Sequence, residues 1–125
     1  MDRLFFILAC LSAFVAVAAG AFGAHALRGK LTPDALNAFE VGVRYQFYHA
    51  LALLAVAWAS SHWPNSNAAI AAWLFVAGTI LFSGSLYVMS LTGIQSLGMV
   101  TPIGGLLFIA GWLYLAWTIF QAGVK

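Results

Sequence analysis

Twelve polar side chains lie between residues 25 and 49, and this is the part of the sequence where chemistry could occur. Imidazole, carboxylate, guanidinium and phenol groups are the usual means of proton transfer, haem ligation and ion binding in proteins. The candidate functional cluster among them comprises His25, Glu40, Arg44, Tyr45, Gln46, Tyr48 and His49.

The spacing of these residues indicates how they would face on a helix. Glu40, Arg44 and Tyr48 share one face, and Glu40 stands four residues before Arg44, a spacing that favours an ion pair. Tyr45 and His49 form a second such pair on roughly the opposite face. Because Glu40 and His49 therefore point apart, we do not expect them to act as an acid–base pair, and we predict no catalytic residue.

Three interpretations of this cluster remain open. The side chains could anchor the helix by reaching the lipid head groups. His25 and His49 could ligate a haem, since they would lie at similar depth on adjacent helices. Finally, His25, Arg44 and His49 could form the mouth of a path for protons or solutes. Anchoring is the simplest interpretation, and we predict neither a cofactor nor a metal site.

The composition places the cluster in a membrane protein. Of the 125 residues, 64% are hydrophobic and 6% are charged, whereas a soluble domain has roughly 45–50% and about 25%. So few charges cannot cover a soluble globule, which disfavours a soluble enzyme, a disordered chain or a disulfide scaffold. The net charge of +2 is too small for a nucleic-acid binder, and the single Cys10 is expected to be a buried or lipid-facing hydrophobe.

Four apolar stretches are long enough, or nearly so, to cross a bilayer, which takes roughly 20 residues. We predict spans at about 4–24, 45–61, 68–90 and 99–121, forming one all-α domain, a four-transmembrane-helix bundle. The first stretch is expected to be a retained span, because the apolar core of a signal peptide typically has 7–15 residues.

The connection between the first two spans holds five of the eight charges, at Arg28, Lys30, Asp34, Glu40 and Arg44. Within it, Thr32 can cap a helix that begins at Pro33. The segment at about 32–44 is therefore predicted to be amphipathic, either a helix on the membrane surface or an extension of the second span, with Gly42 as a possible hinge. The three Lys and Arg residues of this connection, against two at the termini, weakly favour a cytoplasmic location.

Small residues provide surfaces on which membrane helices can pack closely. The first span carries a row of them at intervals of four residues, from Ser12 through Ala16 and Gly20. These surfaces serve packing within the chain and between copies equally well. The predicted helix-packing residues are Gly20, Gly23, Ser83, Gly84, Gly104 and Gly105.

Four segments together are similar to a known family. They read GAFGAHAL at 20–27, VRYQFYHALA at 43–52, LFSGSLY at 81–87 and TPIGGL at 101–106. In these segments the chain resembles the YgdD/YwdK-like small inner-membrane proteins of unknown function, over nearly its whole length. The resemblance implies four transmembrane helices and a bacterial plasma-membrane location, and it brings no established activity, substrate or cofactor.

We therefore expect a protein that acts by association. Its partners would be the lipid bilayer and either further copies of itself or other membrane proteins, and not nucleic acid. The alternative is a small-solute or ion conduit, or a lipid-binding protein, that uses the polar cluster between the first two spans.

Overall fold

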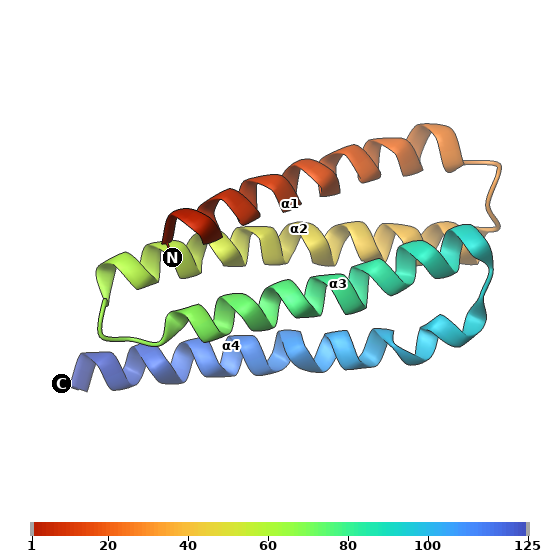
Figure 1. Cartoon of the computed structure of the whole chain (residues 1–125). Helices are drawn as coiled ribbons and strands as arrows, with labels where there is room; N and C mark the ends of the chain where they lie inside the picture. The colour runs from red at the N-terminus through yellow and green to blue at the C-terminus, as the bar shows by residue number, and fades with distance from the viewer. Residues whose placement is uncertain (1, 125) are drawn as a thin grey trace.

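The computed structural model describes residues 2–124, and this part of the chain folds into four long helices joined by short connections (Figure 1). The helices are α1 (Asp2–Phe22), α2 (Pro33–His62), α3 (Ala68–Thr92) and α4 (Thr101–Val124). Two short helical segments accompany them: η1 (Gly23–Leu27), a π-helix that continues α1, and η2 (Gln95–Met99), a 3₁₀ helix before α4. The predicted all-helical fold class is confirmed.

Consecutive helices run in opposite directions and lie side by side, α1 on α2, α2 on α3 and α3 on α4 (Figure 1). Both chain ends therefore lie at the same end of the molecule, and α1 and α4 occupy its two edges. Aromatic rings also make contact between helices that are not consecutive: the Phe5 ring of α1 lies 5.4 Å from the Trp73 ring of α3. The result is an open bundle in which α2 and α3 are covered on both sides.

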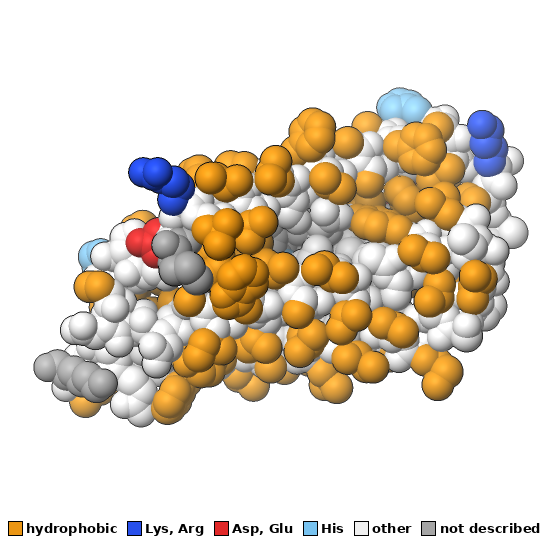
Figure 2. All heavy atoms as spheres, in the orientation of Figure 1, with side chains coloured by type: hydrophobic (Ala, Val, Ile, Leu, Met, Phe, Trp, Pro, Cys, Tyr) orange, Lys and Arg blue, Asp and Glu red, His pale blue; other side chains and the backbone are white. Residues whose placement is uncertain are grey.

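Three segments are long and apolar enough to cross a membrane, namely Asp2–Leu27, Ala68–Thr92 and Gln95–Val124. Helix α2 is the exception by composition, since its central turns carry Gln46 and His49. It nevertheless lies alongside the other three helices, and its 30 residues give it a length of about 45 Å, more than a bilayer core needs. On the face drawn in Figure 2, hydrophobic side chains cover the middle and charged side chains stand at the two ends.

The start of α2 settles the form of the amphipathic segment. Thr32 caps the helix as predicted, because its Oγ1 accepts a hydrogen bond of 3.2 Å from the backbone N–H of Ala35. From Pro33 onward the helix is unbroken, so residues 33–44 belong to the same helix as the predicted second span and do not form a separate surface helix. Gly42 is not a hinge: it is buried, and a Cβ there would lie 3.0 Å from the Tyr87 ring, so the glycine lets α3 come close.

The helices approach closely where a glycine faces a bulky neighbour. Gly23 is buried against the ring of Phe39, and Gly104 is buried against the backbone of Phe82. A Cβ at Gly20 would lie 3.3 Å from Val43 Cγ1. These contacts bring α1 against α2 and α3 against α4, and they hold the polar residues of α2 within reach of both neighbours.

The remaining predicted packing residues differ from one another. Ser83 is buried between α2 and α3, and a Cβ at Gly105 would make only an ordinary contact with Phe82, at 3.8 Å. Gly84 would meet no atom within 4 Å, so it makes no close helix contact within the chain. Two further glycines, Gly78 and Gly111, receive the rings of Phe108 and Phe75.

Candidate functional site

The predicted polar cluster divides into a buried half and an exposed half. Gln46 and His49 face the interior of the bundle. Glu40 and Arg44 stand on its outer surface, as does His25 on η1. The cluster therefore forms no common mouth, because its members open to different sides of the protein.

Gln46 joins three helices near the middle of the bundle. Its Nε2 donates hydrogen bonds to the backbone oxygen of Ser12 on α1, at 3.2 Å, and to Ser12 Oγ, at 3.3 Å. Its Oε1 accepts a hydrogen bond of 2.6 Å from the Tyr87 hydroxyl of α3. A carboxamide in hydrocarbon must find such partners within the protein, and here both ends of the amide are satisfied.

His49 joins α2 to α4. Its ring stacks on Phe108, with ring centroids 3.6 Å apart and planes inclined by 7°. Its Nδ1 lies 2.7 Å from the backbone oxygen of Tyr45, and its Nε2 accepts a hydrogen bond of 3.1 Å from Trp112 Nε1. A carbonyl only accepts and an indole N–H only donates. These partners therefore assign the proton to Nδ1 and leave Nε2 as the acceptor.

Two serines of α3 make further hydrogen bonds between helices. Ser83 Oγ on α3 donates a hydrogen bond of 2.6 Å to the backbone oxygen of Gly42 on α2. Ser85 Oγ lies 2.6 Å from Thr101 Oγ1 at the start of α4. Within residues 2–124, every buried side-chain nitrogen and oxygen has a hydrogen-bond partner. Several separate hydrogen-bonded groups thus link the four helices in the interior.

The haem interpretation fails on geometry. His25 is exposed on η1, and the neighbouring Gly23 packs on Phe39, which places His25 near the early turns of α2. His49 lies ten residues beyond Phe39, about 15 Å deeper along the helix axis. The two imidazoles are not at similar depth, contrary to our prediction, and both nitrogens of His49 already have partners.

The exposed half of the cluster borders the seam between α1 and α2. Glu40 and Arg44 line one hollow there together with Gly20. Their charged groups lie more than 4.0 Å apart and form no ion pair, although their spacing favoured one. Tyr48 lies further along the same seam. Tyr45 is partly exposed, and its ring packs on Phe82, with centroids 4.8 Å apart.

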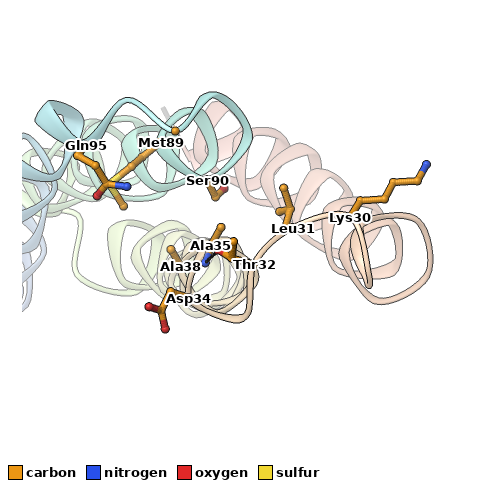
Figure 3. A pocket seen from close by; sticks show the side chains of 10 residues that line it. Lys30, Leu31, Thr32, Asp34, Ala35, Ala38, Met89, Ser90 and Gln95 are labelled. Atoms are coloured by element: carbon orange, nitrogen blue, oxygen red, sulfur yellow. Dashed lines mark hydrogen bonds between the residues drawn. The ribbon is translucent and has the colours of Figure 1, made fainter.

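Another hollow, of about 550 Å³, lies away from this cluster, where α2 begins and α3 ends. Ala35 and Ala38 line it opposite Ser90, and in Figure 3 the side chains of Lys30 and Asp34 point away from its centre. The hollow forms because the side chains that face one another across it are small. Its polar rim suits the boundary between lipid head groups and water.

Sequence reasoning missed the partners of the buried residues, which are Tyr87 and Trp112. The available signal was indirect: Gln46 and His49 lie within an apolar helix, so each needs a donor or acceptor on a neighbouring helix.

The hydrogen bonds of Gln46 allow a quantitative prediction. Replacing Gln46 by leucine leaves the Tyr87 hydroxyl without its acceptor, and we expect the free energy of unfolding to fall by about 1 kcal/mol. Tyr87→Phe alone should cost a similar amount. The double variant should lose less than the sum of the two, because neither polar partner then remains. Unfolding in mixed detergent–lipid micelles measures all three, and strictly additive losses would contradict the bond.

The chain is similar to proteins that share both its length and its membrane character. The model of a protein family of unknown function, DUF423, matches residues 19–105. The UPF0382 membrane protein SAB0533 of Staphylococcus aureus is 49% identical over 119 residues, which cover 95% of this chain and 97% of that protein. The UPF0382 membrane protein YwdK of Bacillus subtilis is 45% identical over 108 residues, covering 86% and 88%.

No solved structure matches the chain. The family match extends from the last four residues of α1 into the start of α4. It therefore includes Gln46 and Tyr87 but not Ser12, and it includes Gly20, Glu40 and Arg44 at the α1–α2 seam. The chain belongs to this DUF423 family, a group of membrane proteins whose function is not established.

Proposed function

We propose that this protein acts without catalysis, as a building block of a membrane assembly in which a second copy packs against α1. The observation that supports the proposal is the open bundle. Among the long helices, α2 is the one that makes an extensive contact with α1. Of the residues of α1, only Phe5, Ala9 and Ala16 are buried. The internal polar groups are satisfied within the chain, so they leave no reactive group free in the interior.

The outer face of α1 is suited to a helix partner. Ile7, Cys10 and Phe14 are exposed and recur at intervals of three and four residues. This spacing is that of a helix–helix seam. A two-fold contact uses the same patch on both copies, and an uncharged patch can face itself without electrostatic cost.

The proposal also includes the membrane location and the orientation of the assembly. The assembly would lie in the bacterial plasma membrane, with the charged connection between α1 and α2 on the cytoplasmic side. The positive-inside tendency of Lys and Arg supports this orientation, with Arg28 and Lys30 in that connection.

Cys10 provides the test, since it is the only cysteine in the chain and is exposed on the outer face of α1. Oxidation or a short bismaleimide in native membranes should link two copies through Cys10, giving a product of twice the chain mass. The matched control is Cys10→Ser with Leu113→Cys, which moves the thiol to the exposed face of α4 and should link far less. A monomer in both cases would overturn the proposal.

A further inference from the structure

A groove runs along the seam between α1 and α2, outside the Gln46 network. Its apolar part has a volume of about 440 Å³ and is lined by Gly20 and Ala21 of α1 and by Phe47 and Tyr48 of α2. The groove exists because α1 presents small residues where α2 presents large ones. Such a channel, open along the side of a membrane protein, has the shape of an extended hydrocarbon chain.

A smaller hollow of about 220 Å³ continues the groove toward the start of α2, and it is lined by Glu40 and Arg44. The two hollows share Gly20, Val43 and Arg44, so they form one continuous site. From the start of α2 inward, the site presents a carboxylate, then a guanidinium, then an apolar channel.

The guanidinium of Arg44 has no opposite charge beside it in the part of the chain that the structure describes. Arg44 is exposed on the outer surface of α2 and lies 11 residues after the start of that helix at Pro33. Among residues 2–124, no carboxylate lies within 4.0 Å of its guanidinium. A charge at such a depth is costly unless it meets an opposite charge. Helical side chains lean toward the N-terminal end of their helix, so the guanidinium reaches toward Glu40 and the nearer membrane surface.

We propose that this groove binds a glycerophospholipid whose head group carries a primary ammonium, such as phosphatidylethanolamine. Arg44 would hold the phosphate, since a guanidinium matches phosphate with two parallel hydrogen bonds. Glu40 would accept hydrogen bonds from the ammonium. One acyl chain would lie along Ala21 and Phe47.

The chemical groups of the site follow the same order as those of the lipid that would bind them. In this lipid class the ammonium lies at the outer end, the phosphate follows and the acyl chains lie deepest. The site shows the complementary order along α2, with Glu40, then Arg44, then Phe47. Glu40 and Arg44 stand one helical turn apart, about 5–6 Å between their Cβ atoms, and because they are not paired with each other, both remain available to the head group.

This site is independent of the proposed dimer contact. The groove lies along the second half of α1, at Gly20 and Ala21, whereas the dimer contact centres on Cys10 in the first half. Loss of lipid binding with intact Cys10 crosslinking would therefore contradict this inference alone. The reverse result would contradict the proposed function alone.

The experiment is native mass spectrometry of the full chain in detergent, titrated with phosphatidylethanolamine, phosphatidylglycerol and phosphatidylcholine of identical acyl chains. The wild-type chain should retain phosphatidylethanolamine best. Arg44→Gln should lower the retention of all three lipids by about tenfold, the effect of losing one charge-assisted contact. Glu40→Gln should remove the preference for phosphatidylethanolamine over phosphatidylglycerol and leave the binding of phosphatidylglycerol intact.

Two further variants separate the groove from general effects on the helix. Ala21→Leu fills the channel and should lower the retention of every lipid. Ala18→Leu adds the same side chain at an exposed position outside the channel and should change nothing. Retention that is indifferent to the head group in the wild type, or unchanged in Arg44→Gln, would overturn the proposal. Circular dichroism shows that each variant is folded before its binding is compared.

Discussion

Replacing Gly104 by alanine is expected to lower the free energy of unfolding by about 3 kcal/mol, at the upper end of the cost of overpacking a core. A Cβ at this position would overlap the backbone nitrogen of Phe82 and would lie 2.7 Å from its Cβ and 2.8 Å from its Cα. Because these atoms belong to the helix itself, no side-chain rotation relieves the contact, and α3 and α4 must move apart.

Gly105→Ala is the matched control. It lies next to Gly104 on α4, and its added Cβ would stand 3.8 Å from the Phe82 ring, an ordinary contact. Alanine also favours the helix over glycine by up to about 1 kcal/mol, so this variant should be neutral or slightly stabilising. Denaturation in mixed micelles compares the two variants, and equal effects would show that α3 and α4 are not in close contact at Gly104.

Gly78 offers a comparison in which the added Cβ would meet a side chain, which can move, and not the backbone. A Cβ there would lie 2.6 Å from the Phe108 ring, which is a side chain. We therefore expect Gly78→Ala to be destabilising, and a second change, Phe108→Leu, to recover part of the loss. No such recovery is available to Gly104→Ala.

The helices themselves could be predicted from the sequence because their signals are local. Long apolar runs interrupted by polar turns predicted four spans, and Thr32 with Pro33 predicted the start of α2. Each of these signals depends only on residues close together in the chain. Gly93 ends α3 in the left-handed conformation, with φ of 77°, at a residue that we had already placed in a connection.

The depth of the polar residues could not be predicted from the same signals. Hydropathy placed the second span at about 45–61, which put Gln46 and His49 near a membrane surface. In the structure α2 begins at Pro33 and is unbroken, so both residues lie near its middle. Their level is set by partners on other helices, Ser12 and Trp112, and such long-range contacts leave no trace in local composition.

The division of the polar cluster into a buried half and an exposed half could not be predicted from local spacing either. Spacing correctly separated the face of Glu40 and Arg44 from that of Tyr45 and His49. It did not show which face was buried, because both contain polar groups. The i,i+4 relation of Tyr45 and His49 does produce a hydrogen bond, but the acceptor is the backbone carbonyl of Tyr45 and not its hydroxyl.

His49→Ala is expected to be the most damaging change inside the polar network, with a loss of about 3 kcal/mol, as for other buried rings. It removes a ring that is only 4% exposed and stacks on Phe108 at 3.6 Å, and it leaves a cavity between α2 and α4. It also removes the acceptor of the Trp112 N–H. Thermal denaturation in detergent and unfolding in mixed micelles both measure this loss.

His49→Phe separates the two contributions. The phenyl ring preserves the stack on Phe108 and loses the two hydrogen bonds of the imidazole, so we expect a cost of about 1 kcal/mol. Adding Trp112→Phe should then cost little more, since the donor whose acceptor is missing has also been removed. If His49→Phe were as damaging as His49→Ala, the hydrogen bonds and not the stacked ring would hold α4 against α2. The ordering of the three variants therefore decides whether His49 stabilises the bundle mainly as an aromatic ring or mainly as a polar link.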